Sequence, residues 1–162
     1  MIRKTKLFDL PAAMGIYSNA REFMAKSGNP KQWVDGYPLR ETIERDIEAG
    51  KSFVYIINGE IAAVFYFAVE IEPTYEKIDG AWLSEDPYGV VHRIARAKNA
   101  TGTGEYCLDW CLGQCGNVRI DTHRDNAPMR GLLERLGFEY CGVVWMKNGD
   151  ERLAYQKTTR EE

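Results

Sequence analysis

The loop Lys98-Asn99-Ala100-Thr101-Gly102-Thr103-Gly104 follows a predicted strand over residues 89–96 and leads into a predicted helix that ends near residue 115. Free N–H groups at the start of a helix lie at the positive end of its dipole and bind phosphate or pyrophosphate. Gly102 and Gly104 would let a ligand approach the backbone closely, because glycine has no Cβ. The loop lacks the Gly-Lys-Ser/Thr of a Walker A motif and the third glycine of a dinucleotide motif. The segment therefore predicts either a phosphate-binding loop or an ordinary strand–helix turn.

A hairpin upstream of this loop gives the clearest local signal. Asn58-Gly59, a dipeptide that two-residue type I′ turns favour, separates two apolar runs over residues 53–57 and 61–71. The longer run alternates, with apolar residues on one face and Tyr66, Glu70 and Glu72 on the other. The other segments carry strand or helix periodicity bounded by turn residues. They predict strands over 2–6, 117–123, 138–147 and 152–157, and helices over 10–27, 38–49 and 127–136.

The order of these elements is β-α-α-β-β-β-α-β-α-β-β, which predicts an α/β (α+β) sheet protein. A length of 162 residues predicts a single domain over 1–162. The composition, 44% hydrophobic and 28% charged, excludes a disordered chain. Residues 158–162 are expected to form a frayed tail.

The charge balance bears on partners and location. The 21 basic and 24 acidic residues give a formal net charge of −3, so no general basic field exists for nucleic acid or an anionic membrane. The longest apolar stretch, Ile61 to Val69, is far shorter than the ~20 residues of a membrane span. The N-terminus lacks the apolar core of a signal peptide. We therefore expect a cytoplasmic protein with neither a nucleic-acid nor a membrane partner.

Four cysteines complete the composition. Cys107, Cys111 and Cys115 recur at every fourth residue, which places them along one helix face, and Cys141 stands apart. The chain has no Cys-x-x-Cys pair, so neither a zinc site nor a redox pair is indicated. Cysteine in this pattern is typical of a small buried apolar residue. We expect reduced cysteines and no metal.

Two blocks of sequence resemble the GNAT superfamily of acetyl-CoA-dependent N-acetyltransferases. In the first, Ile94-Ala95-Arg96 and Thr101-Gly102-Thr103-Gly104-Glu105-Tyr106 lie where that family has its pyrophosphate-binding loop. In the second, residues 121–129 and 132–138 look like the family's strand, its Asn at a helix start and its closing Leu-Gly-Phe. The element order is similar over nearly the whole chain. The resemblance implies a GNAT-like mixed, mainly antiparallel central sheet flanked by helices.

The same resemblance implies acetyl-CoA (CoA) as the cofactor. In this family the pantetheine arm pairs with the backbone of the strand before the loop, and amides of the loop and helix bind the pyrophosphate. The implied cofactor-binding residues here are Ile94, Arg96, Thr101, Gly102, Thr103, Gly104, Glu105, Tyr106 and Asn126. Three positions depart from the family pattern. Thr101 takes the place of the Gln or Arg that begins the loop motif, and Tyr106 replaces its final Gly or Ala. Leu133 replaces the Tyr that protonates the departing thiolate in many members.

The catalytic candidates are His92, Glu70 and Tyr88. His92 lies on the cofactor strand on the same face as Ile94, and histidine is the side chain that ordinarily exchanges a proton near neutral pH. It is either the general base or a hydrogen-bonded strand histidine. Glu70 either accepts the proton or ends the strand in solvent. Tyr88 either replaces the missing proton donor or packs as an aromatic. His123, at the end of the strand over 117–123, either takes part in catalysis or orients the loop at Arg124-Asp125.

Aromatic residues in the loops are candidates for the acceptor pocket. In the family such loop segments build that pocket, and aromatic rings can recognise an amine through cation–π contact. The candidate substrate residues are Trp33, Tyr37, Glu72 and Tyr75, with Trp82 beside them. The sequence leaves open whether these aromatics bind an amine or act as lids that pack over the sheet.

These observations predict an N-acetyltransferase that moves an acetyl group from acetyl-CoA to a primary amine of a small molecule or peptide by direct attack. The alternative is a non-catalytic sensor of CoA or acyl-CoA on the same fold, suggested by Leu133 and the altered loop. A thiol-redox protein using Cys107 and Cys111 is disfavoured. A homodimer through the final strands is left open.

Overall fold

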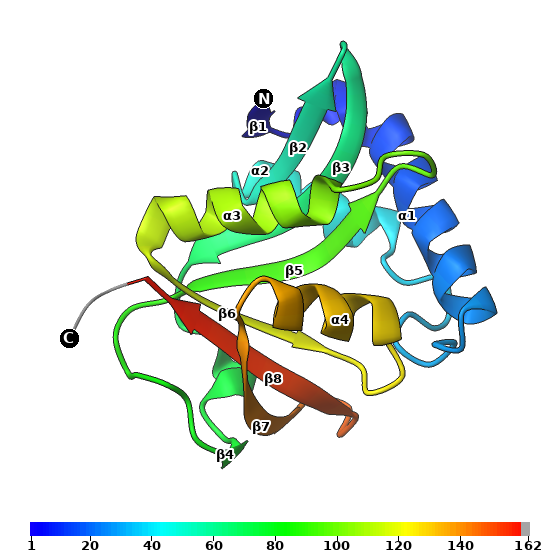
Figure 1. Ribbon diagram of the computed structural model, residues 1–162. Helices are drawn as coiled ribbons and strands as arrows, with labels where there is room; N and C mark the ends of the chain where they lie inside the picture. The colour runs from blue at the N-terminus through cyan, green and yellow to red at the C-terminus, as the bar shows by residue number, and fades with distance from the viewer. Residues whose placement is uncertain (160–162) are drawn as a thin grey trace. The chain divides into compact units, whose positions relative to one another are not determined.

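The strand β5, over Gly89–Arg96, lies within a sheet of eight strands (Figure 1). The computed structural model describes residues 1–159, so the last three residues of the predicted tail lie outside the described range. The strand order is β1-β2-β3-β5-β6-β8-β7-β4. β5 runs parallel to β6, whereas β1–β2, β2–β3, β6–β8, β7–β8 and β4–β7 are antiparallel pairs. The predicted mixed, mainly antiparallel sheet with helices is confirmed.

The described chain groups into two units of dense internal contact. The first comprises Met1–Phe67 and His92–Leu108, and the second comprises Ala68–Val91 and the chain from Asp109 onward. β5 and the helix α3, over Thr103–Cys115, therefore contribute residues to both units. The single domain expected over 1–162 stays a prediction.

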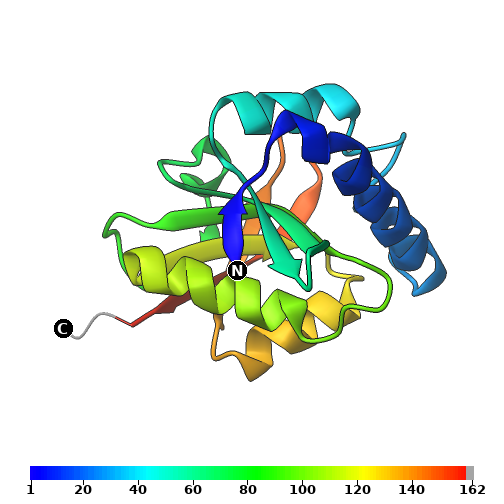
Figure 2. The same ribbon diagram turned by 90° about the horizontal axis from the view of Figure 1, so that it is seen from above.

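The first unit holds the N-terminal helices and strands. Its further elements are β1 (Ile2–Lys4), the 3-10 turn η1 (Leu7–Asp9), α1 (Leu10–Lys26), α2 (Arg40–Glu48), β2 (Ser52–Ile57) and most of β3 (Glu60–Val69). Figure 2 shows β1, at the start of the chain, beside β2. The predicted hairpin turn between β2 and β3 is confirmed, with φ of 51° at Asn58 and 79° at Gly59.

An apolar core joins α1 and α2 to the strands of the first unit. Its buried side chains come from both helices, the loop between them and three strands: Leu10, Ala13, Ile16, Tyr17, Trp33, Ile43, Val54, Val64 and Ala95. Helical spacing places the residues of α1 on one stripe that faces this core. Burial of β3 differs from the predicted alternation, because every residue from Ala62 to Phe67 is buried. Both faces of this strand are covered.

The second unit holds the remaining elements. They are the 3-10 turn η2 (Pro73–Tyr75), β4 (Asp79–Gly80), β6 (Asn117–Thr122), α4 (Ala127–Arg135), β7 (Glu139–Trp145) and β8 (Glu151–Thr158). Its core includes Tyr75, Tyr88, Val90, Val144 and Ala154. Thr158 belongs to β8 and not to a tail, because it pairs with Asn117 of β6.

The sequence did not predict the short strand β4. β4 has two residues and pairs with β7 at Gly80 and Gly142. A Cβ built on either glycine would lie 2.1 Å from a backbone oxygen of the other strand. Only glycine permits so close an approach, and no alternating pattern marks the segment.

Within residues 1–159, no helix is long and apolar enough to cross a membrane.

The segment over residues 70–88 is pinned to the polar face of β6, within the second unit. Asn117, Arg119 and Asp121 alternate along that face. The Nδ2 of Asn117 donates to the Pro87 carbonyl at 3.1 Å, and Arg119 donates to the Ser84 carbonyl at 2.6 Å. We call this segment the strap. The polar β6 residues therefore hold a connection that has little regular structure of its own.

Candidate active site

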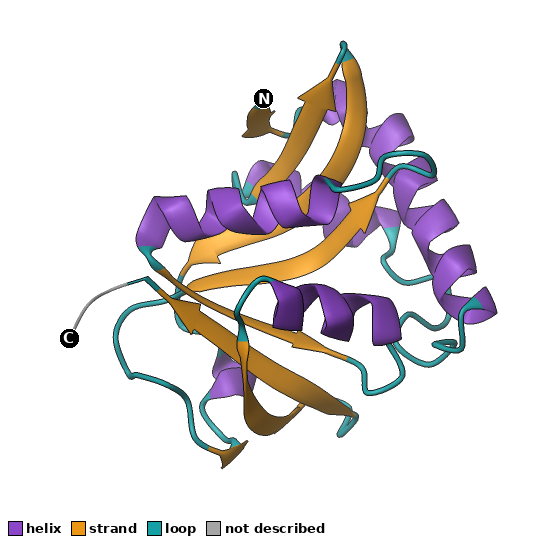
Figure 3. Cartoon of the chain, in the orientation of Figure 1, coloured by secondary structure: helices purple, strands orange, loops and turns teal. Residues whose placement is uncertain are grey.

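The loop between β5 and α3 is built by local hydrogen bonds in the first unit. Figure 3 shows it as a short connection between a strand and a helix. The hydroxyl of Thr103 donates to the Ala100 carbonyl at 2.9 Å, and the Ala100 amide donates to the Ala97 carbonyl at 3.1 Å. Gly102 has φ of 76°, and a Cβ built there would meet no atom within 4 Å. The loop is thus closed by its own backbone and is open around Gly102.

The start of α3 offers a set of backbone donors. The amide of Tyr106 donates to the Gly102 carbonyl at 3.3 Å, which is the first bond of the helix. The amides of Thr103, Gly104 and Glu105 precede that bond, so the helix itself gives them no acceptor. Three consecutive amides at the positive end of a helix dipole form a site for an anion. Tyr106 itself is half-exposed, and its ring stacks on that of Tyr55 with centroids 4.3 Å apart.

His92 lies on β5, four residues before the strand ends. Its ring centroid is 5.3 Å from that of Tyr66 on β3, and the side chain is half-buried. Ile94 is half-buried two residues further along β5, and Arg96 is exposed at the end of the strand. The three residues predicted on this strand therefore lie in series toward the amide donors of α3.

Arg93, between His92 and Ile94, is a functional candidate that the sequence did not reveal. Its φ is 48°, a left-handed conformation that costs an L residue about 1–2 kcal/mol. Its Nε and Nη2 donate to the two carboxylate oxygens of Asp46 on α2, each at 3.0 Å. Burial raises the pKa of the Asp46 carboxyl, and the Arg93 guanidinium acts in the opposite direction. No sequence pattern marks a positive φ at an arginine.

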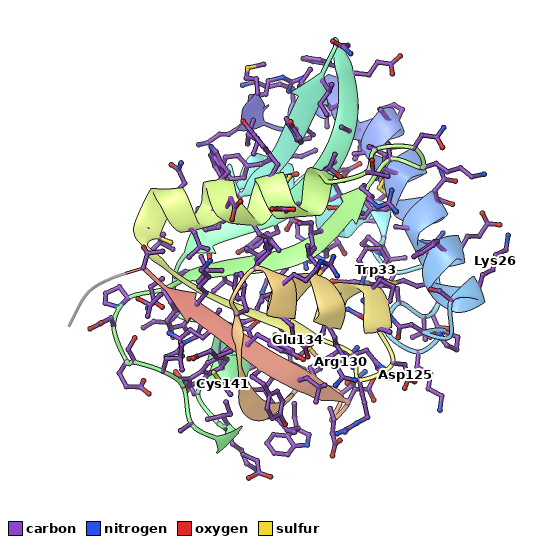
Figure 4. The ribbon with its side chains drawn as sticks, in the orientation of Figure 1. Lys26, Trp33, Asp125, Arg130, Glu134 and Cys141 are labelled. Carbon is purple, nitrogen blue, oxygen red and sulfur yellow. The ribbon has the colours of Figure 1, made fainter. Side chains whose placement is uncertain are left out.

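Of the aromatic residues predicted in the loop after α1, Tyr37 contacts Arg93 and Trp33 packs beside Tyr37. Trp33, labelled in Figure 4, packs edge-on against Tyr17 and Tyr37, with ring centroids 5.8 and 6.2 Å apart. The hydroxyl of Tyr37 accepts from Arg93 Nη1 at 2.9 Å. Trp33 is 8% exposed, whereas Tyr37 is half-buried. Contact of either residue with an amine stays a prediction.

In the second unit, Glu70 and Glu72 follow β3 and do not form its end. β3 stops at Val69, and the Glu72 amide donates to the hydroxyl of Tyr88 at 2.9 Å in place of a strand partner. Pro73 then starts η2. The Tyr88 hydroxyl is the acceptor in this bond, so its own proton remains available to another acceptor.

Tyr75 and Trp82 form an aromatic cluster within the strap. The Tyr75 hydroxyl donates to Asp121 at 2.6 Å, and its ring centroid lies 5.2 Å from that of Trp82. Burial and the negative charge of Asp121 raise the pKa of Tyr75 well above its ordinary value. The guanidinium of Arg119 lies between Trp82 and Tyr88, with its Cζ 4.2 and 4.1 Å from their ring centroids. Sequence reasoning missed Arg119, although it alternates with Asn117 and Asp121.

Asn126 is the N-cap of α4 in the second unit. Its Oδ1 accepts from the Met129 amide at 3.2 Å, a bond that caps the first turn of the helix. Figure 4 shows Asp125 in the turn before α4, and Arg130 and Glu134 on the helix. Next to Asp125, His123 accepts from the Asp125 amide through Nδ1 at 2.9 Å.

The buried face of α3 contains cysteines, as the sequence predicts. Cys107 and Cys111 are fully buried, Cys115 is half-buried and all four cysteines are free thiols. Burial raises the pKa of the Cys107 thiol to about 12, so it stays protonated and unreactive at neutral pH. Among residues 1–159, no cluster of three or more His, Cys, Asp or Glu side chains is placed to hold a metal ion.

Solved structures share this fold over nearly their whole length. An acetyltransferase of the GNAT family from Streptococcus agalactiae is 33% identical, with 99% of this chain and 96% of its own covered and a TM-score of 0.89. A GNAT-family acetyltransferase from Listeria monocytogenes is 20% identical over 98% and 94% of the two chains, with a TM-score of 0.73. A ribosomal-protein-alanine N-acetyltransferase from Brucella melitensis is 21% identical over 98% and 99%, with a TM-score of 0.62. No protein-family model and no curated protein matches the chain.

The last two similarities support the fold alone, whereas the first is close enough to show common family. Three observations together define an acetyltransferase fold: the mixed sheet, the helix start with three amide donors and these similarities. The chain belongs to the GNAT family of acetyltransferases.

Proposed function

We propose that the chain is an N-acetyltransferase that moves an acetyl group from acetyl-CoA to a primary amine of a small molecule or peptide. The observation that carries this proposal is the start of α3. There, the amides of Thr103, Gly104 and Glu105 precede the first helical hydrogen bond, beside an open left-handed Gly102. Membership of the GNAT family supports acetyl-CoA as the ligand of these amide donors, because acetyltransferases of this family generally use it.

The donor set fits a pyrophosphate. Three adjacent amides can each donate to a phosphate oxygen, and the helix dipole favours the negative charge. Two basic residues, Arg96 at the end of β5 and Lys98 at the start of the loop, are exposed and would add attraction for the same charge. Thr101 is exposed and would lie at the edge of this site. The Tyr106 amide is bonded within the helix, so it would not donate to the pyrophosphate. Tyr106 would instead lie at the edge of the site, beside the loop.

Backbone groups of Ile94 and Arg96 would hold the pantetheine arm along β5, and the amide side chain of Asn126 would contact it from α4. When bound, acetyl-CoA supplies an acetyl thioester that an amine can attack directly. The protein must place the amine near the thioester, take up a proton and stabilise the developing negative oxygen.

The proton would pass from the amine to His92, which is half-buried on the cofactor strand. Glu70, just beyond β3, would accept a proton or attract the amine. Tyr88 would return a proton to the thiolate, since its hydroxyl accepts from Glu72 and keeps its own proton to donate. Leu133 cannot take this role, because it is a fully buried apolar side chain.

The amine would be recognised by aromatic and acidic side chains from the loops. Trp33, Tyr37, Glu72 and Tyr75 stay the proposed substrate residues. Tyr37 and Glu72 are half-buried and have surface to offer a ligand, whereas Trp33 and Tyr75 are buried and would act by supporting their neighbours.

A non-catalytic sensor of CoA is the second candidate, and Leu133 at the position of the family's proton donor favours it. The two candidates differ in turnover. The purified protein would be incubated with acetyl-CoA and a panel of primary amines, including polyamines, amino acids and peptides with a free N-terminus, and the free thiol would be measured. An N-acetyltransferase releases thiol only when the right amine is present. Thermal stabilisation by acetyl-CoA with no release for any amine would establish the sensor instead.

A further inference from the structure

We propose that Arg93 is a positioning residue, which fixes the peptide between Arg93 and Ile94 so that the Ile94 N–H faces the acyl end of the cofactor. This inference rests on the proposed function, because that function assigns the Ile94 backbone to the pantetheine arm. It concerns a different part of the molecule from the amide donors of α3. The contacts that carry it all lie within the first unit.

The backbone at Arg93 departs from a regular strand. Its φ of 48° falls in the middle of β5, where the neighbouring residues have strand conformation. A residue in the left-handed region interrupts the regular alternation of N–H and C=O groups along a strand. Such a conformation at an arginine persists only where the surroundings determine it, and strained residues of this kind concentrate at functional sites.

Hydrogen bonds hold Arg93 at two points, its guanidinium and its backbone carbonyl. The guanidinium donates to both oxygens of Asp46 and to the hydroxyl of Tyr37, and its Cζ lies 5.0 Å from the Tyr66 ring centroid. The side chains of Arg93 and Asp46 are only 14% and 10% exposed. A forked guanidinium bound to both oxygens of a carboxylate has one orientation, which a lysine could not reproduce.

The carbonyl of Arg93 accepts from the Tyr17 hydroxyl at 2.8 Å. Burial raises the pKa of Tyr17, so its hydroxyl keeps the proton that it donates. The peptide that follows is planar and trans, so the Ile94 N–H points in the direction opposite to the Arg93 carbonyl. Tyr17 on α1 therefore sets the direction of the Ile94 N–H, and Asp46 on α2 with Tyr37 keeps the arginine in place.

This arrangement assigns α1 and α2 a part in acetyl transfer although neither supplies a reacting group. Misplacing a donor by about 1 Å can lower a rate by ~100-fold. The amides of Thr103, Gly104 and Glu105 would be unaffected by such a change, so cofactor affinity should be retained. A loss in kcat with little change in the KM of acetyl-CoA is therefore the signature of a positioning role.

The test compares Tyr17→Phe and Asp46→Asn with Arg40→Ala in the full chain. Tyr17→Phe removes the hydroxyl that holds the Arg93 carbonyl, and Asp46→Asn removes the charge that holds its guanidinium. Arg40→Ala is the matched control, because it breaks another arginine–carboxylate pair on α2, the exposed Arg40–Glu44 pair. We expect kcat to fall by ~10-fold or more in the first two variants, with the acetyl-CoA KM within ~3-fold of wild type. The control should match wild type.

A second readout does not depend on turnover. The ¹H–¹⁵N resonance of Ile94 should move in Tyr17→Phe and Asp46→Asn, neither of which changes a residue of β5, and should stay in place in Arg40→Ala. If Asp46→Asn does not fold, Tyr17→Phe decides, since it deletes one neutral hydroxyl and keeps the ring. If wild type transfers acetyl to no amine, the proposed function fails, and the Ile94 resonance then tests only whether Tyr17 and Asp46 fix the peptide between Arg93 and Ile94. An unmoved Ile94 resonance, or a kcat within twofold of wild type in Tyr17→Phe, would overturn the positioning role.

Discussion

The hydroxyl of Tyr75 donates to the carboxylate of Asp121 at 2.6 Å, which joins the turn η2 to the strand β6 within the second unit. Tyr75 is 1% exposed, and its raised pKa keeps the phenol protonated at neutral pH. A hydrogen bond to a charged group contributes about 1.5–3 kcal/mol to stability. The bond is therefore a main anchor of the strap.

Tyr75→Phe should lower the free energy of unfolding by about 1.5–3 kcal/mol, because it removes this hydrogen bond and leaves the ring in place. If Tyr75 acts only as an anchor, the KM of the amine should stay within ~2-fold of wild type, which is a change of at most ~0.4 kcal/mol in free energy. Urea denaturation and steady-state kinetics would measure both. Tyr140→Phe is the control, since Tyr140 is 57% exposed. A large rise in the amine KM with unchanged stability would show direct contact between Tyr75 and the substrate.

Gly104→Ala should stabilise the fold and weaken binding of acetyl-CoA. Glycine in a helix costs roughly 0.5–1 kcal/mol relative to alanine, so its removal from the first turn of α3 should raise the melting temperature. A methyl group beside the three amides would obstruct the pyrophosphate, and we expect the Kd measured by calorimetry to rise ~10-fold, which is ~1.4 kcal/mol.

Gly113→Ala provides the matched control for that experiment. Gly113 lies in the same helix, and a Cβ built there meets no atom within 4 Å. It should raise the melting temperature by a similar amount and leave the Kd for acetyl-CoA unchanged. Equal effects of the two variants on binding would refute a cofactor site at the start of α3.

Two substitutions of Asn126 can distinguish its role as a helix cap from its proposed contact with the cofactor. Asn126→Ala should lower stability by about 1 kcal/mol through the loss of the cap on the Met129 amide. Asn126→Asp should keep that stability, because a carboxylate caps equally well, and yet lose the amide donor proposed to face the pantetheine arm. We therefore expect a raised acetyl-CoA KM in both variants and reduced stability only in the first. An unchanged KM in Asn126→Asp would limit Asn126 to capping.

The ion pair of Arg3 and Asp9 predicts a dependence of stability on pH. Arg3 donates to Asp9 at 2.7 Å, and this hydrogen bond lowers the pKa of the Asp9 carboxyl below its ordinary value. A carboxyl with a lowered pKa stabilises the fold above its unfolded pKa, and this contribution is lost as pH falls through the folded pKa. Asp9→Asn should therefore lower stability by about 1–3 kcal/mol at pH 7 and progressively less below pH ~4.

Urea denaturation at pH 7, 5 and 3 would measure this change. Glu44→Gln, which breaks the exposed pair with Arg40, should cost under ~0.5 kcal/mol at each pH. A deficit of Asp9→Asn that is equally large at pH 3 and pH 7 would exclude the ionised carboxylate as its source.

Much of the fold could be predicted because its signals are local. The Asn58-Gly59 turn, the capped start of α4 at Asn126 and the strand β5 follow from turn residues and periodicity within a few positions. The end of β3 and the strand β4 could not be predicted, because contacts distant in sequence determine them. The Tyr88 hydroxyl takes the Glu72 amide, and Gly80 and Gly142 meet across two strands.

The candidate site could be predicted where it depends on a motif and not where it depends on packing. The glycine-bearing loop identified the start of α3, whereas the left-handed turn at Arg93 has no sequence signature, since arginine rarely adopts it. Asp46 and Tyr17 lie 47 and 76 residues from Arg93 in the chain, beyond the reach of any local pattern. The cytoplasmic location and a homodimer through the final strands stay predictions.

The most direct test of the account counts both products of one reaction. With acetyl-CoA and an accepted amine, the free thiol would be measured by its reaction with a chromogenic disulfide, and the N-acetylated amine by mass spectrometry. Direct transfer predicts one acetylated amine for each thiol released, with no release when the amine is omitted. Thiol released without acetylated amine, or acetyl-CoA bound and never consumed with any amine, would contradict the assignment as an N-acetyltransferase.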